Sequence, residues 1–299
     1  MYHNSVLLGE SISFLITNPD GKYIDATFGG GGHTAHILSR LSPSGKLIAF
    51  DRDTDALAGK PDDARLTLVH NNFRFIDNFR RFYFGEEKVD GILADLGVSS
   101  HQFDTPERGF SFRFDAPLDM RMDKGRGRSA ADIVNESDEG TLERILRVYG
   151  EVDGAGRIAG LIIVAREKSP IETTGQLNAA IGAALPKIMA HKQLAKIYQA
   201  LRIEVNGEMK ALEKLLIGSA RSLKEGGRLV VISYHSLEDR MVKNFIKYGN
   251  VEGKAEKDIY GNWNAPLRAV NRKPILPAEN EIASNTRARS AKLRVAEKI

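Results

Sequence analysis

A short apolar segment that runs directly into four consecutive glycines constrains this chain more than any other feature. The apolar segment spans residues 23–28, and the glycines occupy positions 29–32. Because glycine has no Cβ, its backbone can approach a ligand closely. Apolar residues recur at helical spacing in residues 34–41, and the N-terminus of a helix attracts anions. The pattern therefore predicts a strand, a glycine loop and a helix that together form a nucleotide-binding cradle.

A second strand is expected at residues 46–50, and it runs into Asp51. Asp51 lies 19 residues after Gly32. In Rossmann-like folds an acid about 20 residues after the glycine loop binds the ribose hydroxyls. The spacing Gly30-x-Gly32-x-x-Ala35 also satisfies the dinucleotide fingerprint. A nicotinamide or flavin cofactor therefore stays open beside other nucleosides.

Composition limits the classes of function. The 299 residues contain no cysteine, which excludes disulfides, thiolate metal sites and a cysteine nucleophile, and we expect no metal site. The net charge of +4 permits a nucleic-acid partner without requiring one. No apolar run reaches the ~18 residues of a membrane span, and the first residues do not resemble a signal peptide. We therefore expect a cytoplasmic protein without membrane contact.

Strands and helices alternate in the first third of the chain and again near its end. Strands are expected at residues 65–70 and 89–94 with a helix at 75–84 between them, which is typical of a parallel sheet. From about Asp104 only helices are expected, at residues 130–135, 141–149, 156–168, 174–185 and 191–223. A strongly apolar strand follows at residues 228–233.

This interruption divides the chain into three segments. Residues 1–103 and 206–299 are expected to form the two parts of one α/β domain. Residues 104–205 are expected to form an inserted helical domain that recognises the substrate.

Asp95 follows the strand at residues 89–94. Because ligands of parallel sheets bind beyond the carboxyl ends of the strands, Asp95 should face the same crevice as Gly31 and Asp51. The alternative is that Asp95 caps a helix or a turn, since a cap needs only an acceptor. Residues 107–123 show neither helical nor strand period, and such a segment is usually functional or disordered. Its phenylalanines argue against disorder.

Ten short motifs occur in order along nearly the whole chain. They occupy residues 3–8, 23–33, 51–53, 95–100, 108–112, 117–122, 199–203, 205–206, 236–240 and 287–290. Together they resemble the bacterial ribosomal RNA small subunit methyltransferase H family. One motif alone has little specificity, but the set keeps the family's order and spacing. The resemblance implies an S-adenosylmethionine-dependent enzyme that methylates the exocyclic N4 of one cytidine in the decoding region of small-subunit (16S) rRNA.

The resemblance also implies a fold and a set of cofactor contacts. The fold is α/β, a class I (Rossmann-like) methyltransferase sheet of seven strands with the last strand antiparallel, interrupted by an inserted helical domain. The implied cofactor contacts are Gly31, Gly32, His33, Asp51, Phe73, Asp95 and Gln102. The implied partner is small-subunit rRNA in an assembled or late-assembly subunit, and a homodimer stays open.

Methylation of a cytosine amine needs a group that draws an N–H proton away, because the N4 lone pair is delocalised into the ring. Asp95 is the first candidate, either for polarising the amine or for holding the amino-acid end of the cofactor. Ser233, Tyr234 and His235, at the end of the last apolar strand, are the next candidates for the base pocket, and Ser233 and His235 are further catalytic candidates. His235 could equally be a structural histidine. Ser236 and Asp239 resemble a capping box at the start of a helix.

Basic side chains near the crevice are the expected RNA contacts. Arg287 and Arg289 precede a strand with alternating apolar residues, which makes them candidates for binding phosphates. The alternative is that one of them pairs with an acid such as Asp239. A looser basic stretch near Tyr260 and Trp263 contains Arg268, Arg272 and Lys273. That stretch fits either RNA contact or a cover for the sheet.

Two other functions stay open. An NAD-dependent oxidoreductase is permitted by the glycine spacing, although it explains neither residues 95–102 nor the helical insertion. A non-catalytic RNA-binding assembly factor with a methyltransferase fold explains the same motifs, and an assay of turnover would separate it from an enzyme.

Overall fold

The computed structural model describes residues 5–186, 188–255 and 265–299. His3, Asn4, Tyr260 and Trp263 therefore lie outside the described residues. The chain separates into two compact units. The sheet unit combines Met1–Gly97 with Met209–Ile299, and the helical unit is Val98–Glu208, which contains the predicted insertion at 104–205.

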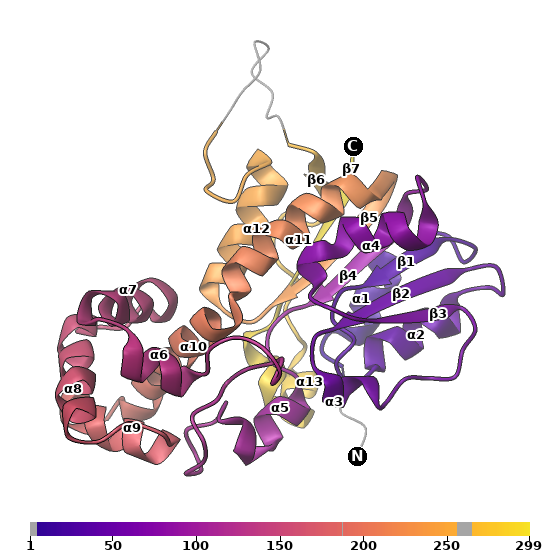
Figure 1. Cartoon of the computed structure of the whole chain (residues 1–299). Helices are drawn as coiled ribbons and strands as arrows, with labels where there is room; N and C mark the ends of the chain where they lie inside the picture. Colours follow the sequence, from indigo (N-terminus) through magenta and orange to yellow (C-terminus); the bar gives the residue numbers. More distant parts are fainter. Residues whose placement is uncertain (1–4, 187, 256–264) are drawn as a thin grey trace. The chain divides into compact units, whose positions relative to one another are not determined.

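The sheet unit is built on seven strands (Figure 1). They are β1 (Lys22–Asp25), β2 (Lys46–Asp51), β3 (Leu66–His70), β4 (Val89–Asp95), β5 (Leu223–Ser233), β6 (Leu267–Ala269) and β7 (Lys292–Lys298). The strand order is β3-β2-β1-β4-β5-β7-β6, and β7 runs antiparallel to both β5 and β6. This arrangement confirms the predicted class I methyltransferase fold.

Helices cover both faces of the sheet. In chain order the helices of this unit are α1 (Leu8–Leu15), α2 (Gly32–Arg40), α3 (Thr54–Leu57), η1 (Phe73–Phe75), α4 (Ile76–Phe84), α11 (Glu208–Ser222, which begins at the last residue of the helical unit), α12 (Ser236–Tyr248), α13 (Glu279–Ser284) and η4 (Thr286–Ser290), where η marks a 3₁₀ helix. Helices α1 and α2 share one apolar core with the sheet, whereas α4, α11 and α12 share another. Among the described residues, no helix is both long and apolar enough to cross a membrane.

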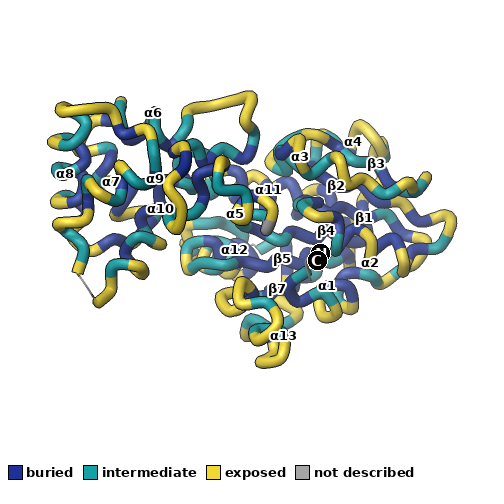
Figure 2. Tube along the Cα trace, turned by 90° about the horizontal axis from the view of Figure 1, so that it is seen from below, coloured by how far each residue is buried: buried dark blue, intermediate teal, exposed yellow. Residues whose placement is uncertain are grey.

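Successive residues of the central strands contribute to opposite cores. Tyr23 packs into the core with α1 and α2, and the adjacent Ile24 packs into the core with α4, α11 and α12. Both side chains are fully buried, as are most residues along the central strands (Figure 2). Burying such a side chain contributes roughly 1.5–3 kcal/mol, which explains why these strands are apolar on both faces.

The helical unit has its own apolar core. Its helices are α5 (Ser100–Asp104), η2 (Pro106–Arg108), α6 (Ala130–Glu136), α7 (Glu139–Gly150), α8 (Ala155–Lys168), α9 (Thr174–Ile181), η3 (Gly182–Ala184) and α10 (Ala190–Asn206). The irregular segment at 107–123 is ordered by two buried side chains. Arg108 donates to the carbonyl oxygens of Arg121 and Met122, and the Asn206 amide bonds the backbone of Met120 and Met122.

The structure differs from the expected helices in three places. The helix expected at 174–185 ends at Ile181, and the 3₁₀ helix η3 follows it. The stretch predicted as one helix at 191–223 is two helices, because Gly207 ends α10 with a left-handed φ of 58° that favours glycine. The cap of α12 is His235 rather than Ser236, and its Nδ1 accepts from the Glu238 backbone N–H at 3.4 Å. The predicted capping box at Ser236 is therefore wrong by one residue.

A buried carboxylate connects β1 to the helix that follows the glycines. Asp25 is fully buried, and its two oxygens accept hydrogen bonds from Thr27 N at 3.0 Å and from Thr34 Oγ1 at 2.7 Å. Burial raises the pKa of Asp25 to about 6, while nearby His33 and the two hydrogen bonds lower it. These bonds hold the glycine segment between β1 and α2 in place.

We predict that Thr34→Val destabilises the protein by roughly 1–3 kcal/mol, because it removes a donor from a buried carboxylate. The loss of stability should be larger at pH 8 than at pH 5. The variant raises the pKa of Asp25 in the folded protein further, and the higher pKa costs stability where folded Asp25 is ionised, because the buried carboxylate then has one hydrogen-bond donor fewer. Denaturant unfolding at both pH values measures the difference. Thr67→Val, on β3, is the matched control and should change little; an equal loss at both pH values would contradict the assignment.

Candidate functional site

The glycine loop presents an uncapped helix N-terminus. Gly31 is the N-cap of α2 with a φ of 77°, and among the described residues the helix has no side-chain cap hydrogen bond. A Cβ added to Gly32 would collide with Ser5 Oγ. Phe28 N donates to Phe50 O at 2.7 Å, which ties the loop to the end of β2. The free N–H groups and the helix dipole make this end of α2 suited to a carboxylate or another anion.

His33 lies in the first turn of α2 with its ring buried. Its Nε2 lies 3.2 Å from Val6 O, so this nitrogen carries the proton, and burial lowers the pKa of the ring. The other nitrogen, Nδ1, lies 3.7 Å from Asp95 Oδ2. A neutral, buried imidazole is suited to shaping the pocket, and the backbone N–H of His33 belongs to the uncapped helix end.

Asp51 ends β2 and organises the adjacent loops. Its oxygens accept from Gly29 N at 2.7 Å and from Asp53 N at 2.8 Å, and burial raises its pKa. Each carboxylate oxygen can accept a second hydrogen bond, so ribose hydroxyls still fit. Asn71 N donates to Asp51 O at 2.9 Å, which brings the chain after β3 alongside. Phe73 starts η1 two residues later and is half-buried.

Asp95 ends β4, next to β1 in the sheet. Its backbone N–H donates to Thr27 Oγ1 at 2.7 Å, and its Oδ1 accepts from the Tyr234 hydroxyl at 2.7 Å. The side chain keeps 22% of its surface exposed. Asp95 therefore combines a fixed position with access to solvent at the carboxyl end of the sheet.

The surroundings of Asp95 give it an unusual acidity. Burial is the main cause that raises its pKa to about 7, and the charge of Glu238 adds to the rise. The hydrogen bond from Tyr234 works in the opposite direction because it favours the ionised form. A carboxyl group with a pKa near neutrality can both accept and release a proton at physiological pH.

Ser233 and His235 have structural contacts. Ser233 is buried, and its hydroxyl donates to Lys292 O at 3.4 Å across to β7. His235 caps α12, and its Nε2 lies 3.2 Å from Glu238 Oε1. Glu238 in turn accepts from Tyr234 N at 2.9 Å. Catalytic roles for Ser233 and His235 stay predictions.

The remaining predicted residues lie elsewhere. Gln102 belongs to the helical unit and forms a capping box with Ser99 at the start of α5. Its predicted cofactor contact stays a prediction. Arg287 and Arg289 lie in η4 with exposed side chains. Asp239, the alternative partner suggested for them, instead pairs with Arg294 at 2.6 Å and Lys292 at 3.6 Å.

Two contacts of the site have only weak signals in the sequence. Thr27 precedes the glycines and supplies the acceptor for Asp95 N. The sequence makes Tyr234 a candidate for the base pocket, because it follows the strand next to β4, but no pattern predicts that its hydroxyl bonds the Asp95 carboxylate.

The glycine loop, the acid ending β2 and the acid ending β4 thus come together at one edge of the sheet. The sequence matches the MraW methylase family over residues 1–299. This chain belongs to that family. Membership confirms the resemblance found in the motifs and the expected cofactor, S-adenosylmethionine.

Curated relatives extend over the same length. A ribosomal RNA small subunit methyltransferase H from Flavobacterium johnsoniae is 55% identical over 298 residues, covering 100% of this chain and 98% of the relative. A protein of the same name from Flavobacterium psychrophilum is 56% identical over 292 residues, covering 98% of this chain and 100% of the relative. One from Bacteroides fragilis (strain YCH46) is 54% identical over 298 residues, covering 99% and 97%.

We predict that Asp51→Ala weakens binding of S-adenosylmethionine by roughly 1.5–3 kcal/mol, because hydrogen bonds to a charged group are lost. Isothermal titration calorimetry measures the affinity. Asp62→Ala removes an exposed acid from the loop before β3 and is the matched control. Unchanged cofactor affinity in Asp51→Ala would reject the assignment of ribose binding.

Proposed function

We propose that this protein transfers the methyl group of S-adenosylmethionine to the exocyclic N4 of a cytidine in the decoding region of small-subunit rRNA. The names of relatives at 54–56% identity support methylation of small-subunit rRNA. The assignment of cytosine N4 as the methylated atom rests on the sequence motifs and on the chemistry of Asp95, at the end of β4. Asp95, with its raised pKa and its fixed geometry, is the observation that carries this proposal.

The residues of the cradle fit this cofactor. The uncapped N-terminus of α2, at Gly31 to His33, suits the carboxylate of the methionine part. Asp51 suits the ribose hydroxyls, and the half-buried ring of Phe73 suits the adenine. When bound, the cofactor supplies a methyl group on a positively charged sulfonium. The protein then has to hold the acceptor amine in line with that methyl.

Asp95 activates the N4 amine for methyl transfer and removes its proton. A cytosine N4 donates poorly because its lone pair is shared with the ring. An ionised Asp95 that accepts an N–H hydrogen bond shifts electron density onto N4 and takes up the proton after transfer. Tyr234 is a positioning residue here, because its hydroxyl holds Oδ1 and leaves Oδ2 for the amine.

The alternatives explain less of the molecule. Membership of a methylase family favours methyl transfer over a nicotinamide-dependent oxidoreductase. A non-catalytic assembly factor would not need a carboxyl group tuned to a pKa of about 7 at the end of β4. The helical unit is proposed to recognise the RNA, as expected for an insertion in a small catalytic domain.

One experiment tests the function directly. The protein is incubated with methyl-labelled S-adenosylmethionine and small ribosomal subunits that lack the modification, and the label is located by nuclease digestion and mass spectrometry. We expect one labelled cytidine, with the methyl on N4. Label on another base or another atom, or no label on any rRNA, would overturn the proposal.

We predict that Tyr234→Phe moves the acidic limb of the pH–kcat profile to higher pH. The wild-type limb should fall near pH 7, where Asp95 loses its proton, and loss of the Tyr234 hydrogen bond raises the pKa of Asp95 further. Rates should therefore recover at high pH in Tyr234→Phe. Asp95→Asn is the companion variant, with kcat lowered by roughly 10²–10⁴ and no limb. A limb that stays in place in Tyr234→Phe would contradict the role of Asp95.

We predict that a double Arg287→Gln, Arg289→Gln variant binds rRNA more weakly at unchanged cofactor affinity. If both arginines contact phosphates, the slope of log affinity against log salt should decrease by about 0.7 for each contact. Filter binding over a salt series measures the slope. Lower thermal stability with an unaltered slope would show that the pair serves the fold instead.

A further inference from the structure

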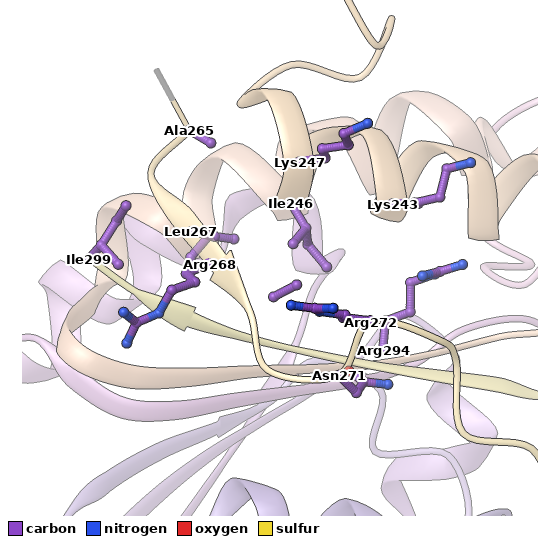
Figure 3. Close-up of a pocket in the computed structure, with 11 residues that line it drawn as sticks. Lys243, Ile246, Lys247, Ala265, Leu267, Arg268, Asn271, Arg272, Arg294 and Ile299 are labelled. Carbon is purple, nitrogen blue, oxygen red and sulfur yellow. The ribbon is translucent and has the colours of Figure 1, made fainter. Parts of the chain in front are cut away.

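A basic pocket lies at the β6 edge of the sheet unit. Its volume is about 460 Å³, and it is formed by α12, by β6 with the turn after it, and by β7 (Figure 3). None of Gly31, Asp51 or Asp95 lines it. Strand order places β6 and β7 beyond β5, away from the strands that carry the cofactor site. The pocket is therefore a separate feature of the sheet unit.

Cations dominate the lining of this pocket. Lys243, Lys247, Arg268, Arg272 and Arg294 line it, and no acidic side chain does so among the described residues. In Figure 3 both lysines extend from α12, Arg272 and Arg294 lie below that helix, and Arg268 lies to one side, near Ile299. Ile246 and Leu267, both buried, contribute an apolar surface to the pocket.

The cations differ in how far they are neutralised. Arg294 pairs with Asp239 at 2.6 Å, and Arg268 pairs with Glu297 at 2.6 Å. Lys243 and Arg272 are exposed, and neither has an acidic partner within 4.0 Å in the described part of the chain. Within residues 5–186, 188–255 and 265–299, these two side chains are therefore positive charges of the pocket without an acidic partner.

The turn that carries Arg272 is held in place by its neighbour. The Asn271 amide donates to the carbonyl oxygens of Lys273 at 2.8 Å and Leu293 at 3.1 Å, and its oxygen accepts from Val295 N at 2.7 Å. All polar groups of this side chain are therefore used within the fold. They fix the backbone on both sides of Arg272, so its guanidinium starts from a defined position next to α12.

We propose that this pocket binds the sugar–phosphate backbone of single-stranded rRNA from the substrate, at a distance along the strand from the target cytidine. Lys243 and Arg272 contact phosphates, and the sugar–phosphate backbone runs through the pocket between α12 and β6. Exposed cations that lack an acidic partner among the described residues suit a single strand, whose backbone a positively charged groove can follow. The proposal rests on the proposed function, which makes rRNA the substrate.

The test is a double Lys243→Gln, Arg272→Gln variant in the full-length protein. Its affinity for naked small-subunit rRNA should fall, and the salt slope should decrease by about 1.4 because two single-strand phosphate contacts are lost. Between about 50 and about 200 mM salt the affinity advantage of the wild type should then shrink about sevenfold. Cofactor affinity and kcat should stay unchanged while KM for rRNA rises. Arg272→Lys should retain the slope.

Two further variants sharpen the result. Arg40→Gln, Lys60→Gln removes two exposed cations near the opposite edge of the sheet and should leave the slope unaltered. Ala269→Glu adds an acid at an exposed position of the pocket without removing a contact, and should weaken rRNA binding while thermal stability is maintained.

An unchanged slope and affinity in the pocket variant would overturn the proposal. So would weaker binding to assembled subunits with unaltered binding to naked rRNA, because the pocket would then contact a protein. If the wild type itself neither binds nor methylates small-subunit rRNA, the proposed function fails as well. If the wild type methylates small-subunit rRNA and the pocket variant binds it with unchanged affinity and slope, only the proposal for the pocket is rejected.

Discussion

The site depends on how two carboxyl groups are stabilised at the ends of adjacent strands. Asp25 ends β1 and Asp95 ends β4, and burial raises the pKa of both. A buried carboxylate is costly unless donors reach its oxygens. The donors come from separate parts of the chain: Thr27 N and Thr34 Oγ1 for Asp25, and the Tyr234 hydroxyl for Asp95. The bonds that reduce the cost of burial therefore also fix α2 and the end of β5 around the site.

Much of the sheet could be predicted because its residues obey a local rule. Strands buried on both faces appear as continuous apolar runs, so β2, β4 and the apolar part of β5 were placed close to their observed ranges. The strand-end rule placed Asp51 and Asp95 at one edge. It could not specify hydrogen bonds between distant segments, such as that of Tyr234 with Asp95, which depend on side-chain geometry across 139 positions of sequence.

The errors arose where two local signals compete. The apolar period continues from α10 into α11, but the left-handed conformation of Gly207 stops the helix. Serine is usually the stronger cap, yet His235 caps α12. Similarly, the alternation of apolar residues in β7 is compatible with a solvated face for Arg294, whereas α12 packs on β7 and Arg294 is buried, with 8% of its surface exposed. The alternation of apolar and polar residues along a strand does not reveal which face of that strand a helix will cover.

Asp239 connects that covered strand to the basic pocket. Its carboxylate accepts from Arg294 at 2.6 Å and lies 3.6 Å from Lys292, and these cations hold its pKa below the usual range. An unpaired arginine under α12 would be strongly destabilising, so the acid allows the basic strand to be buried. The same acid is then fully engaged and cannot neutralise Lys243 one turn further along α12. Asp239 of α12 is thus used to neutralise β7. Lys243, further along α12, stays available to bind a polyanion.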